Sequence, residues 1–409
     1  MSEPTAPSAS PASSAPTVIA DDEALAAILP ALSADTGPLS ADTERAAGFR
    51  YSQRAYLIQL KTASTGVHLI DPIDISPEAM AALDQAVVGK EWILHAATQD
   101  LPSLQEAGLN PTVLFDTELA ARLLGRERVG LGPLVEDVLG VTLAKDHGYS
   151  DWSTRPLPAD WLTYAGLDVE YLIELRDALQ DELIQAGKEE WARQEFAHAL
   201  KYEPTPLDNP WRRTSDIPLV RTRRGLGVLR ELWLTRDEIA AALDLSPHRI
   251  VNDRAISAVA SHVDDSGLPN SRRVFTTGSW SARIARNYTN QWLDAVSRGM
   301  ALSASELPPM KVRREGPPSP GMWAKRDPEA AQRWDVVRPV IKDLAEEITM
   351  PVENLISPRP LRALLWRPVG TSVEALSAQL ADLDVRPWQA ALVAPLIAQA
   401  LADMEYPAE

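Results

Sequence analysis

The first half of the chain alternates short apolar segments with segments of helical spacing. Residues 55–62 (AYLIQLKT) and 66–71 (GVHLID) are rich in apolar side chains and flank a turn-like AST, which predicts a pair of strands. Residues 91–97 (EWILHAA) and 113–117 (VLFDT) predict two more strands, each followed by a pattern typical of a helix. Because the strands are first clustered and then alternate with helices, this region predicts a mixed α/β sheet covered by helices.

The second half of the chain carries helical patterns. Prolines mark residues 203–220 as a linker, and an internal repeat follows it. Apolar positions of the first copy recur 105 residues later, as Ile239/Leu344, Leu243/Ile348, Leu245/Met350, Ile250/Leu355, Val251/Ile356 and Ile256/Leu361. The match runs through a turn and into the next helix, so we predict two related helical modules joined by the Pro-rich segment 307–321.

These patterns divide the chain into four parts. We predict a disordered tail over residues 1–20, an α/β domain over 21–205, a helical module over 215–300 and a second, divergent helical module over 325–406. The tail prediction follows from the Pro-, Ala- and Ser-rich start, MSEPTAPSASPASSAPT, which has neither the basic nor the apolar segment of a signal peptide.

The composition excludes several classes of protein. The 409 residues include no cysteine, which excludes disulfides, thiolate catalysis and cysteine-ligated zinc or iron–sulfur sites. No apolar run approaches the roughly 18 residues of a membrane span. We therefore expect a cytoplasmic protein that has no membrane partner, and nothing in the sequence suggests an obligate dimer, so we expect a monomer.

The charge is distributed unevenly. The formal net charge of −17 argues against a protein that coats nucleic acid by charge alone. By segment it is about −18 for residues 1–204, about +5 for 205–330 and about −4 for 331–409. The acidic front is explained either by solubility or by acids that hold cations, and the basic middle is suited to an anionic partner.

The tripeptide DTE occurs twice and has two interpretations. At Asp116–Glu118 it opens a predicted helix, where an aspartate caps free backbone N–H groups and a glutamate suits the positive helix end. At Asp42–Glu44 it stands beside predicted strand, and residues i and i+2 of an extended chain point to one face. Two adjacent like charges are unfavourable unless solvent or a cation separates them, so the first triplet is a candidate metal site.

Two further positions carry candidate chemistry. Asp100 follows the predicted strand at 91–97, where it either caps the next helix or contributes a functional carboxylate. Tyr164 and Asp168 (YAGLD) lie one turn apart on a predicted helical stretch over 158–187, which predicts either a surface hydrogen bond or a shared site.

Together these positions supply four carboxylates and one phenol: Asp42, Glu44, Asp100, Asp168 and Tyr164. Converging carboxylates repel one another unless cations are present, and hard oxygen ligands select Mg²⁺ or Mn²⁺. Two such ions are the usual device for hydrolysing phosphodiesters, and a tyrosine hydroxyl can orient the attacking water or take part in its deprotonation.

The order D-x-E, then an aspartate after LHA, then Y-x3-D resembles that of the DEDD exonucleases of the Tyr subclass. The segments ADTERAAGFRYSQRAYLIQL, LHAATQDL, FDTELAARLLG, DWSTRPLP and YAGLDVEYL resemble ribonuclease D in particular. The segments LRELWLTRDEIA and PHRIVNDRAI resemble the helicase-and-RNase-D C-terminal (HRDC) domain, and the second module resembles a more divergent copy. The resemblance covers roughly residues 35–405.

This resemblance implies an RNase H-like mixed-sheet exonuclease domain followed by two all-α HRDC-like domains. It implies a two-metal 3′–5′ exoribonuclease that acts on RNA with a single-stranded 3′ end, as in tRNA maturation. Asp42, Glu44, Asp100 and Asp168 would hold two Mg²⁺ or Mn²⁺ ions, and Tyr164 would position the water. The triplet at Asp116 would be a structural turn.

Arginines and aromatics crowd the basic middle of the chain. Arg221, Arg223 and Arg224 are expected to border the exonuclease cleft and to bind nucleic acid. Later aromatics are expected to form mainly the core of a helical bundle; they are Phe275, Trp280, Tyr288 and Trp292. His68, His95 and His147 form no cluster with metal-ligand spacing and are not expected to bind metal.

Two alternatives remain open from the residues. The same five side chains would serve a 3′–5′ DNA exonuclease, because the metals act on phosphate and discrimination against DNA needs contacts to the 2′-OH. The chain could also be mainly an RNA-binding or scaffolding protein with slight turnover, although the complete set of five residues argues against this.

Overall fold

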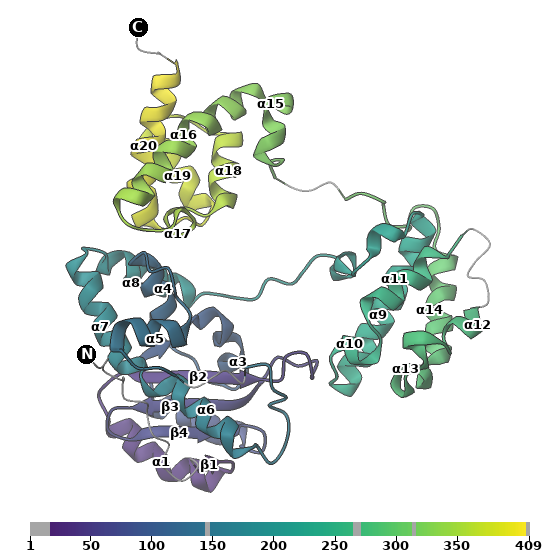
Figure 1. Cartoon of the computed structure of the whole chain (residues 1–409), viewed down its shortest axis with the longest axis horizontal. Helices are drawn as coiled ribbons and strands as arrows, with labels where there is room; N and C mark the ends of the chain where they lie inside the picture. Colours follow the sequence, from purple (N-terminus) through teal and green to yellow (C-terminus); the bar gives the residue numbers. More distant parts are fainter. Residues whose placement is uncertain (1–16, 144–147, 265–270, 313–315, 406–409) are drawn as a thin grey trace, which may run out of the picture.

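The structure is a computed structural model that describes residues 17–143, 148–264, 271–312 and 316–405. Figure 1 shows an α/β domain in purple to teal and two helical modules in green and yellow. No helix in these ranges is long and apolar enough to cross a membrane. His147 lies outside the described residues.

The sheet of the α/β domain is mixed, with six strands in the order β1-β4-β3-β2-β5-β6. The strands β2, β3 and β4 form an antiparallel meander, whereas β1 pairs with β4, β5 with β2 and β6 with β5 in parallel. Their bounds are β1 (Val18–Ile19), β2 (Leu39–Arg45), β3 (Ala55–Thr62), β4 (Gly66–Ile70), β5 (Glu91–Leu94) and β6 (Val113–Asp116). The predicted mixed sheet is thus confirmed.

Helices cover both faces of this sheet, and each face contributes apolar side chains to a core. Ala41, Ile58 and Leu60 pack into the main core with the helices of one layer. The opposite face packs against α6, where Leu57 lies in one cluster with Leu162. The helices of this domain are α1 (Asp22–Ala34), α2 (Pro77–Ala86), α3 (Leu101–Glu106), α4 (Thr117–Leu123), α5 (Leu131–Leu139), α6 (Ala159–Glu170), α7 (Leu172–Gln185) and α8 (Glu189–Ala199), with the short 3₁₀ helix η1 at Ala97–Gln99.

The first helical module has a core of its own. Phe275, Trp280 and Trp292 are buried in it and Tyr288 packs on its edge, so the expectation that these aromatics are core is confirmed. Short 3₁₀ turns precede it at Pro210–Arg213 and Ile217–Leu219. Its helices are α9 (Arg223–Leu243), α10 (Pro247–Ile250), α11 (Asp253–Ser261), α12 (Ser271–Val274), α13 (Arg283–Asn287) and α14 (Thr289–Ala301), with the 3₁₀ turn η4 at Gly278–Ser281.

The second helical module repeats the first half of this arrangement. Its helices are α15 (Trp323–Arg326), α16 (Pro328–Glu347), α17 (Val352–Leu355), α18 (Pro358–Trp366), α19 (Val373–Asp382) and α20 (Pro387–Glu405), after the 3₁₀ turn η5 at Pro320–Met322. The starts of α16, α17 and α18 lie 105 residues after those of α9, α10 and α11. Asp244 and Thr349, also 105 apart, are both left-handed, with φ of 46° and 50°. The predicted repeat is therefore present as a helix–turn–helix–helix unit.

The two modules contact the α/β domain in different ways. The first meets the tip between β2 and β3 through polar contacts, in which Ser52 N donates to Asp244 Oδ1 (2.8 Å) and Tyr51 Oη to Asp237 Oδ2 (3.0 Å). The second shares the main apolar core of the α/β domain. There the ring of Trp388 stacks on Trp191 with centroids 4.8 Å apart. The second module is thus built into the exonuclease half of the molecule, whereas the first is attached to it at its surface.

Two sequence predictions need correction, and the sequence analysis missed one helix. Val18 and Ile19 form an edge strand on β4, so the tail predicted over 1–20 ends earlier; residues 1–16 lie outside the described ranges. The helix α1, capped by the Asp21 side chain, was not predicted. The stretch 158–187 is two helices, because the backbone leaves helical geometry at Tyr171.

Candidate metal centre on strand β2 and helix α6

The first DTE triplet lies within strand β2, so Asp42 and Glu44 extend from the same face of the sheet. That face is covered by α6, which carries Tyr164 and Asp168 one turn apart. One carboxylate oxygen each of Asp42, Glu44 and Asp168 lie within 4.8 Å of one another. Glu44 is buried, and Asp42, Tyr164 and Asp168 are partly exposed. The fold therefore joins two of the separated sequence motifs at one point.

Asp100 lies between η1 and α3 and contacts strand β2 near Asp42. Strand β5 pairs with β2 only at Leu39 and Ser40, and the chain that leaves β5 continues beside the rest of β2. The Thr43 hydroxyl, which points to the other face from Asp42, donates to Asp100 Oδ1 at 2.7 Å. Asp100 is 4 % exposed and makes no side-chain cap to α3, so the capping interpretation is wrong for this residue.

The carboxylates of this cluster repel one another when they are ionised. Burial, and then the carboxylates of Asp100, Asp168 and Glu44, raise the pKa of Asp42 well above its ordinary value. Burial raises the pKa of Asp100 to about 6, although the hydrogen bond from Thr43 acts in the other direction. The ionised cluster is therefore unfavourable in the metal-free fold, and a bound cation would relieve the repulsion.

The donor set fits a hard divalent cation. Asp42, Glu44 and Asp168 offer carboxylate oxygens only, which Mg²⁺ and Mn²⁺ prefer and which lack the nitrogen or sulfur typical of zinc sites. Neither described histidine of the sequence analysis joins them. His95 is partly buried and its Nδ1 lies 2.9 Å from the Thr117 hydroxyl. His68 is half-buried on β4.

The second DTE triplet is a helix cap, as its position in the sequence predicts. Asp116 Oδ1 accepts from the backbone N–H groups of Glu118 (2.9 Å) and Leu119 (3.0 Å) at the start of α4. The same carboxylate accepts from the N–H groups of Ala96 and Ala97. Asp116 thereby ties the turn that leads to Asp100 to strand β6.

The three arginines of the basic middle do not lie where the sequence analysis placed them. The end of α9 at Asp244 contacts the α/β domain, whereas Arg223 and Arg224 lie at its other end, about 30 Å away for a helix of 21 residues. Arg223 donates to the carbonyls of Ala304 and Leu307, and Arg224 to that of Leu302. Arg221 is exposed at the same end. They do not border the cleft, and two of them hold the segment after α14.

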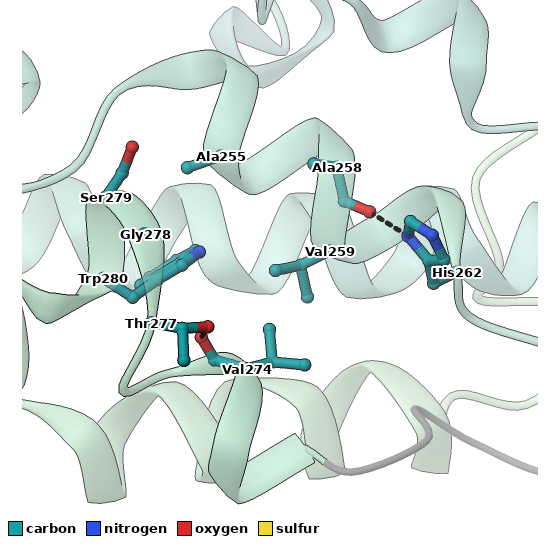
Figure 2. Close-up of a pocket in the computed structure, with 9 residues that line it drawn as sticks. All are labelled: Ala255, Ala258, Val259, His262, Val274, Thr277, Gly278, Ser279 and Trp280. Carbon is teal, nitrogen blue, oxygen red and sulfur yellow. Dashed lines mark hydrogen bonds between the residues drawn. The ribbon is translucent and has the colours of Figure 1, made fainter.

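A cavity of about 460 Å³ lies in the first module and not at the acidic cluster. Figure 2 shows its lining, with Val259 of α11 between Val274 and Trp280 and with His262, the residue after α11, at one end. Its walls are mostly apolar, and His262 Nδ1 is held 2.7 Å from the Ala258 carbonyl oxygen. The residues that line this hollow include no carboxylate, which argues against a site for Mg²⁺ or Mn²⁺.

Two polar residues beside the cluster escaped the sequence analysis. Thr43 was hidden inside the triplet, although the alternation of a strand directs it away from its neighbours and toward Asp100. Gln59 belongs to β3, every residue of which is buried. A glutamine in such an apolar run was the signal that could have marked it.

Comparisons with known proteins match family models to three parts of the chain. A family model described as 3′-5′ exonuclease matches residues 16–184, and an HRDC domain model matches 225–296. The second module matches a model described as 3′ to 5′ exonuclease C-terminal domain over 316–401. The second module was predicted as a divergent HRDC copy. It matches a different family model from the first module, although the two modules share the helical repeat.

Several whole proteins resemble the chain over most of its length. The ribonuclease D of Gluconacetobacter diazotrophicus is 31% identical over 301 residues, which cover 70% of this chain and 73% of that protein. A crystal structure of a protein from Bifidobacterium adolescentis is 35% identical with a TM-score of 0.82, covering 95% of this chain and 97% of that one. The structure of Escherichia coli RNase D, an exoribonuclease involved in structured RNA processing, is 25% identical with a TM-score of 0.67, covering 96% and 100%. The 31% identity over 70% of this chain shows that the chain belongs to the ribonuclease D family of 3′–5′ exonucleases.

Proposed function

We propose that this chain is a two-metal 3′–5′ exoribonuclease whose active site is the cluster on β2, α6 and the turn before α3. The observation that carries the proposal is the convergence of carboxylate oxygens from Asp42, Glu44 and Asp168 within 4.8 Å. Asp168 lies more than 120 positions after Asp42 and Glu44 in the sequence, and folding brings the three together in spite of their mutual repulsion. Such an arrangement is unfavourable without a cation, and the family to which the chain belongs depends on divalent metals.

Each side chain has a distinct part in this proposal. Asp42, Glu44 and Asp168 would hold Mg²⁺ or Mn²⁺, and Asp100, fixed by Thr43, would complete the ligand set for a second ion. When bound, two such ions lower the pKa of the attacking water and neutralise charge on the phosphate and the leaving oxygen.

Tyr164 supports the attacking water. Its phenol lies one turn before Asp168 on α6 and at the edge of the cluster that this helix forms with β3. A hydroxyl at this place can accept a hydrogen bond from the water and align it with the phosphorus atom. Replacement of Tyr164 by Phe is therefore expected to lower kcat more than it changes the affinity for metal.

The proposed substrate is RNA with a single-stranded 3′ end, with tRNA precursors as the candidate class. The relatives are named ribonuclease D, and the structural relative from E. coli is described as acting in structured RNA processing. We propose a monomer in the cytoplasm, where a chain without cysteine needs no oxidising environment.

The test is degradation of an RNA with a 3′ overhang and of the matched DNA, each with Mg²⁺, Mn²⁺ or EDTA, by wild type and Asp168→Ala. We expect metal-dependent shortening of RNA from the 3′ end, and loss of it in the variant. Equal degradation of DNA would keep the chemistry and overturn the substrate. Binding of RNA without any degradation would favour a scaffolding protein.

A further inference from the structure

Gln59 of β3 has a polar side chain that is fully buried. It is 0 % exposed, and neither its Nε2 nor its Oε1 has a hydrogen-bond partner among the described residues. An amide left in this state lowers stability relative to one that is paired, and an apolar side chain of the same shape would avoid the loss.

The register of the sheet places this amide beside the acidic cluster. Gln59 is the direct partner of Asp42 in the antiparallel ladder of β2 and β3. Side chains of such partners extend from the same face, with Cβ atoms about 5 Å apart. The flanking pairs on this face are Glu44 with Leu57 and Ser40 with Lys61.

Two other buried polar side chains on this face, Lys61 and Ser40, can be compared with Gln59. The Lys61 amino group donates to the Glu170 carbonyl at the end of α6. The Ser40 hydroxyl, in contrast, is fully buried and also lacks a partner. Ser40 lies diagonally across from Gln59, within reach of a long side chain. Two unpaired groups thus lie together on the face that carries Asp42.

We propose that Gln59 is a positioning residue whose Nε2 donates a hydrogen bond to the Asp42 carboxylate when this carboxylate binds a divalent cation. The inference rests on the proposed function and deepens it. The Ser40 hydroxyl donates to Gln59 Oε1 and so keeps the Nε2 end toward Asp42. A neutral amide suits this place because it orients the ligand without adding a charge that competes with the metal, and groups that orient metal ligands strongly affect metal affinity.

The experiment measures the Mn²⁺ concentration that gives half of the full thermal stabilisation in the whole chain. The variants are Gln59→Met, which keeps the length of the side chain, and Gln59→Leu, in case the first packs poorly. The matched control is Leu57→Met, which changes the buried partner of Glu44 on the same strand and face. We expect the half-point to rise about tenfold or more in the Gln59 variants. The melting temperature in EDTA should stay equal or rise, and the control should keep the wild-type half-point.

Each other outcome has a distinct meaning. A Gln59 variant that melts lower in EDTA but keeps the wild-type half-point for Mn²⁺ has lost a packing residue, and the inference is overturned. The same conclusion holds if Leu57→Met raises the half-point as much as Gln59→Met. If wild type itself gains no stability from Mn²⁺ or Mg²⁺, the proposed metal centre is contradicted and this inference is overturned with it.

Discussion

The same three residues, Asp-Thr-Glu, stand at two places in this molecule and have different surroundings. In the first triplet, Asp42 and Glu44 extend from a strand toward Asp168 on α6. In the second, Asp116 ends a strand and accepts from backbone N–H groups at the start of α4. The difference teaches that the nearest partners decide the role of a carboxylate: other carboxylates make a candidate metal site, and backbone donors make a cap.

The two threonines differ in the same way. Thr43 donates to the Asp100 carboxylate and so extends the acidic cluster toward a further ligand. Thr117 donates to the Leu94 carbonyl at 3.3 Å and meets the ring of His95, which ties two neighbouring strands together. The triplet at Asp42–Glu44 therefore lies among other carboxylates, whereas the triplet at Asp116–Glu118 links backbone segments through hydrogen bonds.

The largest effect is expected from Asp42→Asn. Removing the carboxylate that faces both Glu44 and Asp168 should lower kcat by on the order of 10³-fold, about 4 kcal/mol of transition-state stabilisation. Stability in EDTA should be unchanged or higher, because like-charge repulsion is relieved. Single-turnover RNA degradation and melting in EDTA measure both quantities. A variant that keeps most of the wild-type rate contradicts the metal-centre assignment.

Asp116→Ala should mainly lower the stability of the fold. Four backbone N–H groups lose their acceptor, so the free energy of unfolding should fall by about 2–4 kcal/mol. Urea denaturation in EDTA measures this, with Asp116→Asn as the control that keeps a capping oxygen. If the alanine variant is as stable as wild type but inactive, the second triplet is not a cap.

Acidification should stabilise the metal-free protein. A folded-state pKa above the unfolded value means that stability is fully present below about pH 4 and is lost as the pH rises through the folded pKa. Burial raises the pKa of Asp100 and that of Asp116 to about 6, and the pKa of Asp42 is raised well above the ordinary value. The free energy of unfolding in EDTA should therefore increase from pH 7 to pH 5.

This pH dependence distinguishes the two triplets. Asp42→Asn should show a smaller increase than wild type, and the part that belongs to Asp116 should remain. Acids with lowered pKa values, such as Glu190 at about 2, keep their contribution across this range and lose it only in stronger acid. Burial lowers the pKa of His95 to about 4 and lowers that of His68, so these two groups oppose the increase and should do so equally in wild type and variant. Urea titrations at the two pH values measure the effect. A decrease in stability from pH 7 to pH 5 would contradict the assignment of raised pKa values.

The smallest effect is expected from Glu118→Gln in the second triplet. Glu118 pairs with Arg122 one turn later at 2.7 Å, on a partly exposed helix surface. Such a pair contributes about 0.3–0.5 kcal/mol, so thermal stability should fall slightly and activity should stay at the wild-type level. The matched change Glu44→Gln should instead remove metal binding. Equal effects of the two substitutions on activity would remove the distinction between the triplets.

The sequence carried enough information for four of the six strands, for the repeat and for the five proposed site residues. Short segments rich in apolar residues predict β3 and β4, and the 105-residue offset reappears in the starts of α10 and α17. The site depended on combining motifs, because Asp42, Asp100 and Asp168 each have an ordinary explanation when considered alone. Only the folded chain brings Asp42 and Asp168 to within 4.8 Å with Glu44.

Other features depend on tertiary contacts that no local pattern encodes. The arginines at the start of α9 were expected at the cleft. Arg224 instead donates to the Leu302 carbonyl at the end of α14, which is far from Arg224 in sequence. The partnership of Gln59 with Asp42 depends on strand register, which the apolar run of β3 does not specify for its polar member. The edge strand at Val18 is too short to carry a pattern and forms because β4 offers it a partner.

The central claim is that the first DTE triplet holds divalent metal and the second does not. The most direct measurement is a calorimetric titration of Mn²⁺ into wild type, Asp42→Asn and Asp116→Asn, each confirmed to be folded. We predict that wild type and Asp116→Asn bind the ion with similar affinity and that Asp42→Asn loses the binding. Unchanged binding by Asp42→Asn, or loss of binding in a folded Asp116→Asn, would contradict the claim.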